Sequence, residues 1–306
     1  MKGKDLDHLA NELLDAELAG TGTRECRLPT REGIAAITQR YVAILLPVFL
    51  RKHNGIPNLD TQSYLQEINR PLTDQICRAL QFDARVHGKE IPKKAEDCAA
   101  EQTEAVLKQL PELAQLLVGD IQAAFASDPA APSLEEIVLS YPGLETITVQ
   151  RLAHRLYLMG IPFIPRMMTE VAHSRTGIDI HPGASIGEKF FIDHGTGVVI
   201  GETATIGSEV VLYHGVTLGA FNPLIKDHHG QIQRGQHNKR HPDIEDHVTV
   251  YPNATILGGN TRIGHHSVIG GNVWLTHSVP PYSTVVVREP DPVIRNRAKP
   301  PLIWEI

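Results

Sequence analysis

The sequence predicts an α+β protein: a helical N-terminal domain precedes a solenoid of short strands, with one extruded loop and a flexible C-terminal tail. The 306-residue chain is 42% hydrophobic and 21% charged, which is ordinary globular composition with room for two domains. Apolar residues recur at helical spacing up to about Ser174, and they recur every six residues after Gly177. Thirteen of the 16 histidines lie in the second half, which makes that half the first place to look for chemistry.

Helical spacing of apolar residues is clearest in two groups of the first half. They are Leu6, Leu9, Leu13 and Leu14, and then Leu110, Leu113, Leu116, Leu117 and Ile121. Pro29, Pro57, Pro92 and the D-P-A-A-P segment at 128–132 interrupt the pattern. We predict a helical domain over residues 1–174, with long helices at about 144–158 and 164–173.

The second half carries four series of aliphatic residues spaced six apart. They are Ile180, Ile186 and Ile192; Ile200, Ile206, Leu212 and Leu218; Ile244, Val250 and Ile256; and Ile263, Ile269 and Leu275. In many units a small or β-branched residue follows four positions later, and both positions must point into a narrow prism. We predict a solenoid over residues 175–288 and a tail over 289–306.

The six-residue phase breaks at three places. Two residues are added between Ile192 and Ile200, one between Ile256 and Ile263, and a long insertion follows Leu218. Sites are commonly built where a regular solenoid is interrupted. The insertion, with its loop at 221–240, is expected to leave the coil, either as a lid or subunit clasp or as a surface loop.

Composition excludes several classes of protein. The net charge of −6 argues against a nucleic-acid partner, and the longest apolar run, at 41–50, is about half of what a membrane span needs. The N-terminus carries charges and no apolar secretory core. Cys26, Cys77 and Cys98 have no regular spacing, so we expect neither disulfides nor a zinc knuckle and favour a reducing cytoplasm.

Four motifs carry a resemblance to a known family. They are G-I-D-I-H-P at 177–182, F-I-D-H-G-T-G-V-V-I-G-E-T-A at 191–204, G-V-T-L-G at 215–219 and R-H-P at 240–242. With matching helical pieces, they cover about residues 120–285 and resemble the serine O-acetyltransferases among the hexapeptide-repeat acyltransferases. The resemblance implies a left-handed parallel β-helix. It also implies acetyl transfer from acetyl-CoA to the L-serine hydroxyl, the first step of cysteine biosynthesis from serine.

Acetyl transfer to a hydroxyl needs a base near neutral pH, and imidazole suits that task. His194, at the first phase break, is the candidate catalytic base. Asp179 matches the family position that orients the imidazole and stabilises its charged form. Without the resemblance, Asp179 is equally well interpreted as a turn residue, and most of the other late histidines as solvated corner residues.

The substrate's ammonium and carboxylate also need partners. Asp128 and Asp193 match family residues that hold the substrate. The guanidinium of Arg240 can bind a carboxylate through two N–H groups, and His241 would complete the pocket. The alternatives are that Asp128, which precedes Pro129, only stops a helix, and that Arg240 is a solvated loop charge.

Acetyl-CoA is expected to lie along a groove between neighbouring β-helices and to contact mainly backbone. Gly219 and Ala220 match the family's Gly-Gly position, where small residues let the thioester approach. Four further cofactor-binding candidates lie downstream: Tyr251, Ala254, Gly258 and Gly271. Tight solenoid corners require glycines equally. We expect no metal, because the spacing of the histidines in the loop does not by itself supply converging ligands.

The chain ends in an apolar segment with Ile306 as its last residue. The resemblance implies that Ile306 and its carboxylate bind O-acetylserine sulfhydrylase, whereas the alternative is that the tail packs on the solenoid. The resemblance also implies a homo-oligomer, a trimer or a dimer of trimers.

Three other functions stay open at the level of sequence. One is a related acyltransferase with a homoserine or sugar acceptor, although Asp128 and Arg240 favour an amino acid. The others are a β-helical metalloenzyme similar to carbonic anhydrase and a scaffold without catalysis.

Overall fold

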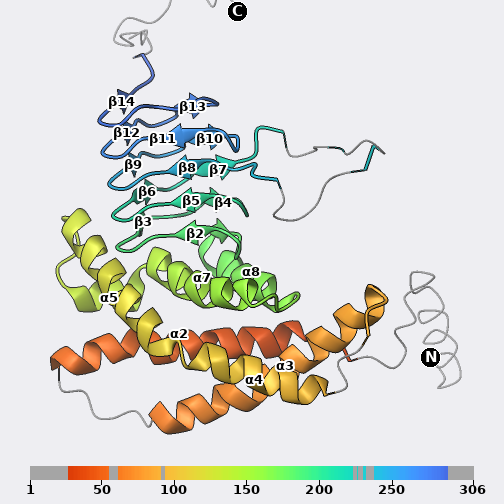
Figure 1. Ribbon diagram of the computed structural model, residues 1–306. Helices are drawn as coiled ribbons and strands as arrows, with labels where there is room; N and C mark the ends of the chain where they lie inside the picture. Colours follow the sequence, from red (N-terminus) through yellow and green to blue (C-terminus); the bar gives the residue numbers. More distant parts are fainter. Residues whose placement is uncertain are drawn as a thin grey trace, which may run out of the picture.

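A computed structural model describes residues 27–54, 61–90, 94–222, 226, 230–231 and 238–288. The helices lie together at one end of the strand region (Figure 1). Their bounds are α2 (Arg31–Asn54), α3 (Thr61–Val86), α4 (Ala95–Leu107), α5 (Leu110–Ser127), α6 (Leu134–Ser140), α7 (Pro142–Leu158) and α8 (Ile164–Thr176). The two long helices expected at 144–158 and 164–173 are thus present as α7 and α8. Gly177 ends α8 in the left-handed conformation, with φ of 72°, which favours glycine.

Short strands follow α8 and wind into a solenoid of about five turns. The first seven are β1 (Asp179–Ile180), β2 (Ser185–Ile186), β3 (Phe191–Asp193), β4 (Val199–Ile200), β5 (Thr205–Ile206), β6 (Val211–Tyr213) and β7 (Thr217–Gly219). The rest are β8 (Asp243–Ile244), β9 (Thr249–Val250), β10 (Thr255–Leu257), β11 (Arg262–Ile263), β12 (Val268–Ile269), β13 (Trp274–Leu275) and β14 (Thr284–Val285). All pairs are parallel, in the orders β1-β4-β7-β10-β13 (sheet A), β2-β5-β8-β11 (sheet B) and β3-β6-β9-β12-β14 (sheet C).

The six-residue series forms the inner lining of the prism. All of its members are buried except Ile186, which is half-buried at the first coil. The small residues four positions later, Ala184, Ala204, Ala254 and Ser267, are also buried. The predicted inward positions are therefore confirmed, and each fully buried aliphatic side chain contributes about 1.5–3 kcal/mol through removal from water.

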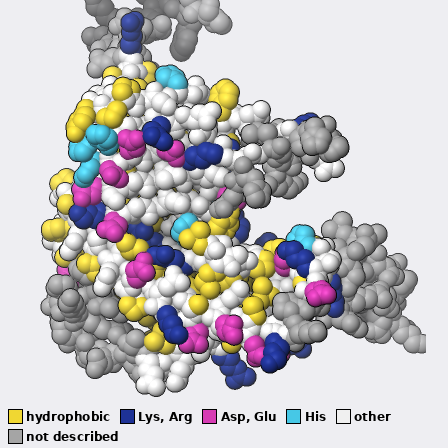
Figure 2. All heavy atoms as spheres, viewed as in Figure 1, with side chains coloured by type: hydrophobic (Ala, Val, Ile, Leu, Met, Phe, Trp, Pro, Cys, Tyr) yellow, Lys and Arg dark blue, Asp and Glu magenta, His cyan; other side chains and the backbone are white. Residues whose placement is uncertain are grey.

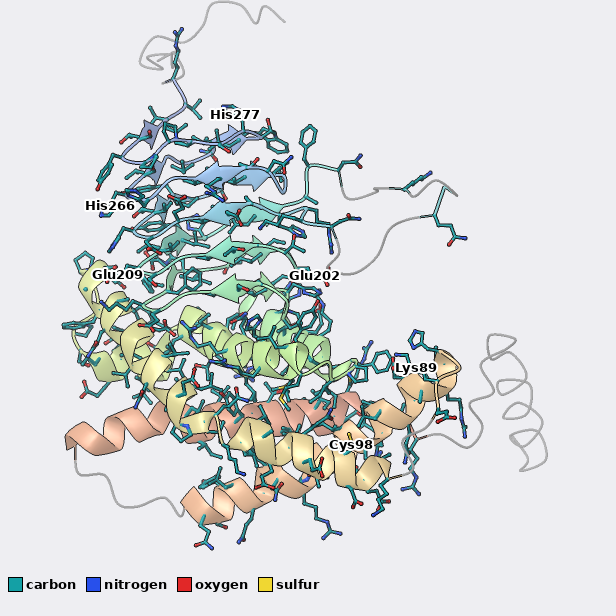
Figure 3. All side chains as sticks on the ribbon, in the orientation of Figure 1. Lys89, Cys98, Glu202, Glu209, His266 and His277 are labelled. Carbon is teal, nitrogen blue, oxygen red and sulfur yellow. The ribbon has the colours of Figure 1, made fainter. Side chains whose placement is uncertain are left out.

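Three corners join the sheets, and we name them by the sheets they connect. The C–A corner includes 194–198 and 214–216, the A–B corner includes 201–204 and 239–242, and the B–C corner includes 207–210 and 245–248. The B–C corner carries a column of residues with positive φ: Lys189, Glu209, His247, His266 and Tyr282. In Figure 3, Glu209 and His266 lie along one edge of the solenoid, and Glu202 lies toward the opposite edge.

One helix closes the first coil of the solenoid. Successive side chains of α7 reach backbone carbonyls of that coil: Gln150 Nε2 donates to Ala184 O at 2.8 Å, and His154 Nδ1 lies 2.8 Å from Pro182 O. Between them, Arg151 donates to Gly187 O at 2.9 Å. These contacts satisfy groups that an uncovered end of the solenoid would leave unpaired.

The long insertion leaves the coil after β7 and returns before β8 (Figure 1). Most of the loop at 221–240 lies outside the described residues. Among the described residues, Cys77 and Cys98 form no disulfide, and Cys26 lies outside the described part. Among the helices of the described residues, none combines the length and apolarity that crossing a bilayer requires.

Candidate active site

His194 projects from the solenoid at the first phase break. Five residues, 194–198, join β3 to β4, whereas only 214–216 join β6 to β7, so the two added residues form a bulge at the C–A corner. His194 adopts φ of 57°, and its side chain is 71% exposed. The phase break thus displays an imidazole on the surface, where a substrate can reach it.

Two carboxylates lie beside this imidazole. Asp193 Oδ2 is 3.7 Å from His194 Nε2, and Asp128 lies close enough to the same ring to interact with it electrostatically. Tyr141 donates a hydrogen bond from its hydroxyl to Asp128 Oδ2. The cluster therefore brings together an exposed base and two acidic groups that suit an ammonium ion.

Asp128 belongs to the helical domain and lies at this corner of the solenoid. Asp128 is the C-cap of α5 in an extended conformation, because the following Pro129 disfavours a helical one. Its Oδ1 accepts a hydrogen bond from the Ala130 amide at 2.8 Å. Gly143, in the first turn of α7, packs on the Ile192 carbonyl so closely that no Cβ would fit. Asp128 can therefore both end helix α5 and present its carboxylate at this corner.

Hydrogen bonding sets the protonation of this pair. The bond from Tyr141, helped by the Ala130 amide, lowers the pKa of Asp128, and the same bond raises the pKa of Tyr141 to about 12. Asp128 is thus a carboxylate at neutral pH, while Tyr141 keeps its proton and stays a donor.

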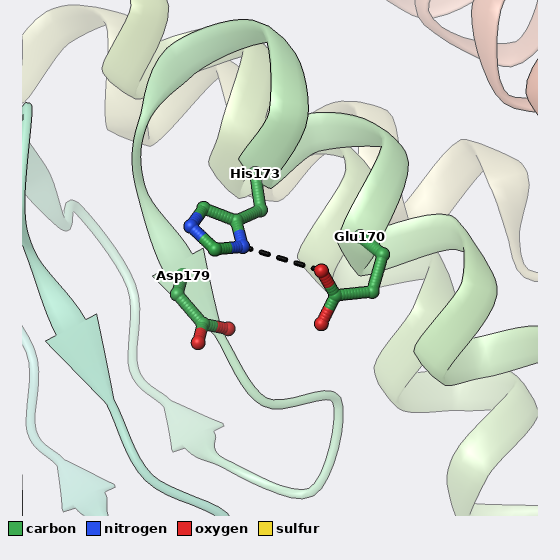
Figure 4. A group of neighbouring side chains, drawn as sticks. All are labelled: Glu170, His173 and Asp179. Atoms are coloured by element: carbon green, nitrogen blue, oxygen red, sulfur yellow. Dashed lines mark hydrogen bonds and ion pairs between the residues drawn. The ribbon is translucent and has the colours of Figure 1, made fainter.

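Asp179 has a different partner from the expected one. Its Oδ1 pairs with Arg166 of α8 at 3.3 Å, and within the described chain no hydrogen bond or ion pair joins Asp179 to His194. Glu170 and His173 complete the group shown in Figure 4, in which His173 Nδ1 is 3.2 Å from Glu170 Oε2. Arg166 also pairs with Glu170 at 2.5 Å, so one guanidinium is shared between the two carboxylates.

A second polar cluster occupies the A–B corner. Arg240 pairs with Glu202, which also accepts a hydrogen bond from the Tyr157 hydroxyl at 2.7 Å. His241 is buried against Gly201, and its Nδ1 lies 2.9 Å from Thr203 Oγ1. Burial alone would raise the pKa of Glu202, but the bonds from Tyr157 and Arg240 hold it below its usual range. Arg240 is thus a fixed cation rather than a solvated loop charge.

Packing at this corner makes Gly201 sensitive to substitution. A Cβ at Gly201 would collide with the imidazole of His241, whereas one at Gly119 in α5 would meet only ordinary van der Waals contact, 3.4 Å from Lys189 Cγ. We expect Gly201→Ala to lower the free energy of unfolding by about 1–3 kcal/mol through overpacking. Gly119→Ala should be neutral or stabilising by up to about 1 kcal/mol. Urea denaturation measures both, and an unchanged midpoint for Gly201→Ala would contradict the prediction.

The expected cofactor residues divide between two corners. Gly219, Ala220 and Gly258 lie at the A–B corner, where a groove of about 290 Å³ runs along the base of the insertion and includes Gly258 and Arg240. Tyr251 and Gly271 lie at the C–A corner, where the Tyr251 ring stacks on that of Tyr213 with centroids 5.1 Å apart.

The sixth expected cofactor residue, Ala254, occupies the core. Its side chain is 0% exposed, and its amide donates to Tyr251 O while its carbonyl accepts from the Thr217 amide. The inward position of the repeat explains this placement, so Ala254 itself offers no free surface to a cofactor. Ile306 lies outside the described residues.

The two polar clusters lie at opposite edges of sheet A. Within one chain the structure groups Asp128, Asp193 and His194 at the edge where its strands begin, and Arg240 with His241 at the edge where they end. Four further polar residues, not selected from the sequence, line these clusters: Tyr141, Glu202, Thr203 and His214. Glu202 and Thr203 stand within the quoted motifs and His214 stands beside one, whereas Tyr141 lies apart from them in the sequence. The His214 ring is 5.8 Å from that of His194, and its enclosed Nδ1 has no partner among the described residues.

Comparison with known proteins identifies the family. No family model matches the chain. A plasmid serine acetyltransferase of Synechococcus elongatus is 47% identical over 262 residues, which cover 83% of this chain and 80% of that protein. The chain belongs to the serine acetyltransferase family. The serine acetyltransferase of Bacillus subtilis is 42% identical over 185 residues, which cover 60% of this chain and 79% of that protein. These relatives are acyltransferases, as the sequence motifs predict.

Solved structures of serine acetyltransferases share the fold. Serine acetyltransferase 1 of Entamoeba histolytica, in complex with L-cysteine, superposes with a TM-score of 0.69 at 36% identity, covering 92% of this chain and 96% of that one. The Neisseria gonorrhoeae enzyme in complex with serine gives a TM-score of 0.55 at 27% identity, covering 89% of this chain and 99% of that one. The predicted fold, a helical domain followed by a left-handed parallel β-helix, is confirmed.

Proposed function

We propose that this chain transfers the acetyl group of acetyl-CoA to the hydroxyl of L-serine, giving O-acetyl-L-serine and CoA. The observation that carries this proposal is the placement of His194 beside Asp128 and Asp193. An exposed imidazole can take a hydroxyl proton near neutral pH, and neighbouring carboxylates suit the ammonium of an amino acid. A sugar without an amino group would have no cation for these carboxylates.

In the proposed reaction His194 acts first as base and then as acid. It removes the proton from the serine hydroxyl, and the oxygen attacks the thioester carbonyl to form a tetrahedral adduct. The carbon–sulfur bond then breaks, and the proton held by His194 passes to the departing CoA sulfur. The acetyl group ends on the serine oxygen, and His194 returns to its neutral form.

Asp179 is proposed to orient His194 through its second ring nitrogen. Asp179 Oδ1 pairs with Arg166, so this role would fall to the other carboxylate oxygen, Oδ2. A carboxylate in that place would favour the charged imidazolium that forms during transfer.

Arg240 and His241 are proposed to bind the substrate carboxylate. They lie at the far edge of sheet A from His194 within one chain, so we infer that a complete site forms between two chains of a homotrimer. The outer side of sheet A supports such contact, because Val199 is 39% and Trp274 is 67% exposed there. The acetyl-CoA groove would then take Gly219 and Gly258 from one chain and Tyr251 from another.

A direct assay tests the proposed reaction. Thiol release from acetyl-CoA is followed with L-serine, L-homoserine, L-threonine and glucosamine as acceptors in parallel. We expect L-serine to give the highest kcat/KM by at least about tenfold over homoserine, since one extra methylene displaces the hydroxyl from a fixed base. A preference for glucosamine or homoserine would redirect the assignment to another acyl acceptor, and activity that disappears with chelators would favour a metalloenzyme.

The C-terminal residue supports a second, separate proposal. We infer that Ile306 binds O-acetylserine sulfhydrylase, because a terminal carboxylate and a branched apolar side chain form a compact recognition element. A chain lacking Ile306 should lose most of its affinity for the sulfhydrylase in a titration and keep its acetyltransferase activity. Equal affinity of the shortened and full chains would refute this partner.

A further inference from the structure

Thr203 makes several of the hydrogen bonds that hold the A–B corner together. It lies in the turn between β4 and β5, directly against the segment 239–241 that returns from the insertion. Its carbonyl accepts a hydrogen bond from Lys239 Nζ at 2.5 Å, and its amide donates to His241 Nδ1 at 3.1 Å. This one half-buried residue thus contacts a segment that is remote in the sequence.

The hydroxyl of Thr203 has all of its hydrogen-bonding capacity assigned. Its Oγ1 accepts from the Arg240 amide at 3.0 Å and from the His241 amide at 3.1 Å. A hydroxyl has two acceptor lone pairs and one proton, so the proton remains for the third neighbour. That neighbour is His241 Nδ1, 2.9 Å away.

These bonds determine the form of the His241 imidazole. Nδ1 receives two donors, the Thr203 hydroxyl and amide, so it can carry no proton of its own. In a neutral ring the proton then resides on Nε2, which has no acceptor among the described residues and is not enclosed by them. Burial, reinforced by the charge of Arg240, lowers the pKa of His241 to about 4, so the ring is neutral at pH 7.

We propose that Thr203 is a positioning residue that fixes His241 as a neutral imidazole whose Nε2–H donates to an oxygen atom of the bound amino acid. His241 is then a donor beside the Arg240 guanidinium, and the two together fit a carboxylate, with His241 unable to act as a base. The identity of the ligand rests on the proposed function, whereas the form of His241 does not.

A spectroscopic measurement tests the form of His241 directly. Full-length protein labelled with ¹⁵N-histidine is observed by NMR at pH 7, and the His241 resonances are assigned by their loss in His241→Gln. We expect a protonated Nε2 and an unprotonated Nδ1 in the unsubstituted chain and in Thr203→Ser. A cationic ring, or a proton on Nδ1, in the unsubstituted chain overturns the proposal whatever the activity.

Kinetics then test the consequence for substrate binding. Thr203→Val keeps the shape of the side chain and removes the hydroxyl, Thr203→Ser keeps the hydroxyl, and Thr205→Val, at an exposed position two residues on, serves as the control. We expect Thr203→Val to raise KM for serine about tenfold with less change in kcat, and Thr203→Ser to restore KM. Equal loss of kcat in Thr203→Val and Thr203→Ser would overturn the positioning role. If the expected form of His241 is found but no chain acetylates serine, the proposed function and the assignment of the ligand fail, and the role of Thr203 in fixing the form of His241 stands.

Discussion

Chains carrying His194→Asn are expected to lose about 10³-fold in kcat/KM for serine, because a positioned general base contributes about 10²–10⁴-fold to such a reaction. Asparagine suits the test, since it tolerates the left-handed backbone that His194 adopts at φ of 57°. The fold and the unfolding midpoint should stay unchanged. Thiol release from acetyl-CoA and thermal unfolding measure the two effects separately.

His247 provides a matched control for this substitution. It is also an exposed histidine at φ of 57° on the same solenoid, but it lies at the B–C corner beside Glu209, away from both polar clusters. His247→Asn is expected to keep nearly full activity. Similar losses for both variants would mean that histidine matters at solenoid corners for structural reasons and that His194 is not the base.

Mixing two inactive chains tests whether the site is shared. His194→Asn chains lack the base, and Arg240→Ala chains lack the cation that we assign to the substrate carboxylate. If each site takes these groups from different chains, random reassociation of equal amounts restores about a quarter of the sites. Activity at low serine should then rise well above that of either variant alone. A mixture no more active than the mean of its parts would place both groups of each site in one chain.

The solenoid could be predicted from the sequence because its period in space is also a period along the chain. A strict six-residue spacing of aliphatic residues leaves little choice about which side chains face inward, and the structure buries all of them but Ile186. Ile186 belongs to the first coil, where a helix rather than another coil is the neighbour. The bulge at His194 was predictable for the same reason, since two added residues must leave the regular path.

Contacts between distant segments could not be predicted in this way. Nothing in the motif around Asp179 specifies that α8 brings Arg166 to its carboxylate, and the bond between Thr203 and His241 spans an insertion of irregular length. Such partners depend on how helices and loops dock, which local spacing does not encode. Ala254 shows the converse, because the repeat pattern alone predicts its inward position, and the structure buries it.

The ion pair between Asp120 and Arg151 is expected to dominate the stability of the junction between helices and solenoid. Arg151 Nε and Nη2 donate to the two oxygens of Asp120 at 2.7 and 2.8 Å, and both side chains are at least 95% buried. Asp120 also accepts from the Phe190 amide at 2.9 Å, so the pair joins α5, α7 and the first coil. Arg151→Met should lower the free energy of unfolding by about 3–5 kcal/mol, because it leaves a buried carboxylate without its counter-charge.

A second ion pair on α7, between Arg155 and Glu112, serves as a comparison that shows how much of the expected loss of stability is due to burial. Arg155 donates to Glu112 at 2.6 Å, but Glu112 is 60% exposed, so Arg155→Met should cost no more than about 1 kcal/mol. Urea denaturation of the two variants measures the difference.

The double variant Asp120→Leu with Arg151→Met should recover part of the lost stability, since no charge stays buried. The recovery is only partial, because the Gly187 carbonyl that accepted a hydrogen bond from Arg151 still lacks a donor. Equal costs for Arg151→Met and Arg155→Met would show that the buried pair contributes no more than a solvated one, and that packing of α7 alone holds the solenoid on the helices.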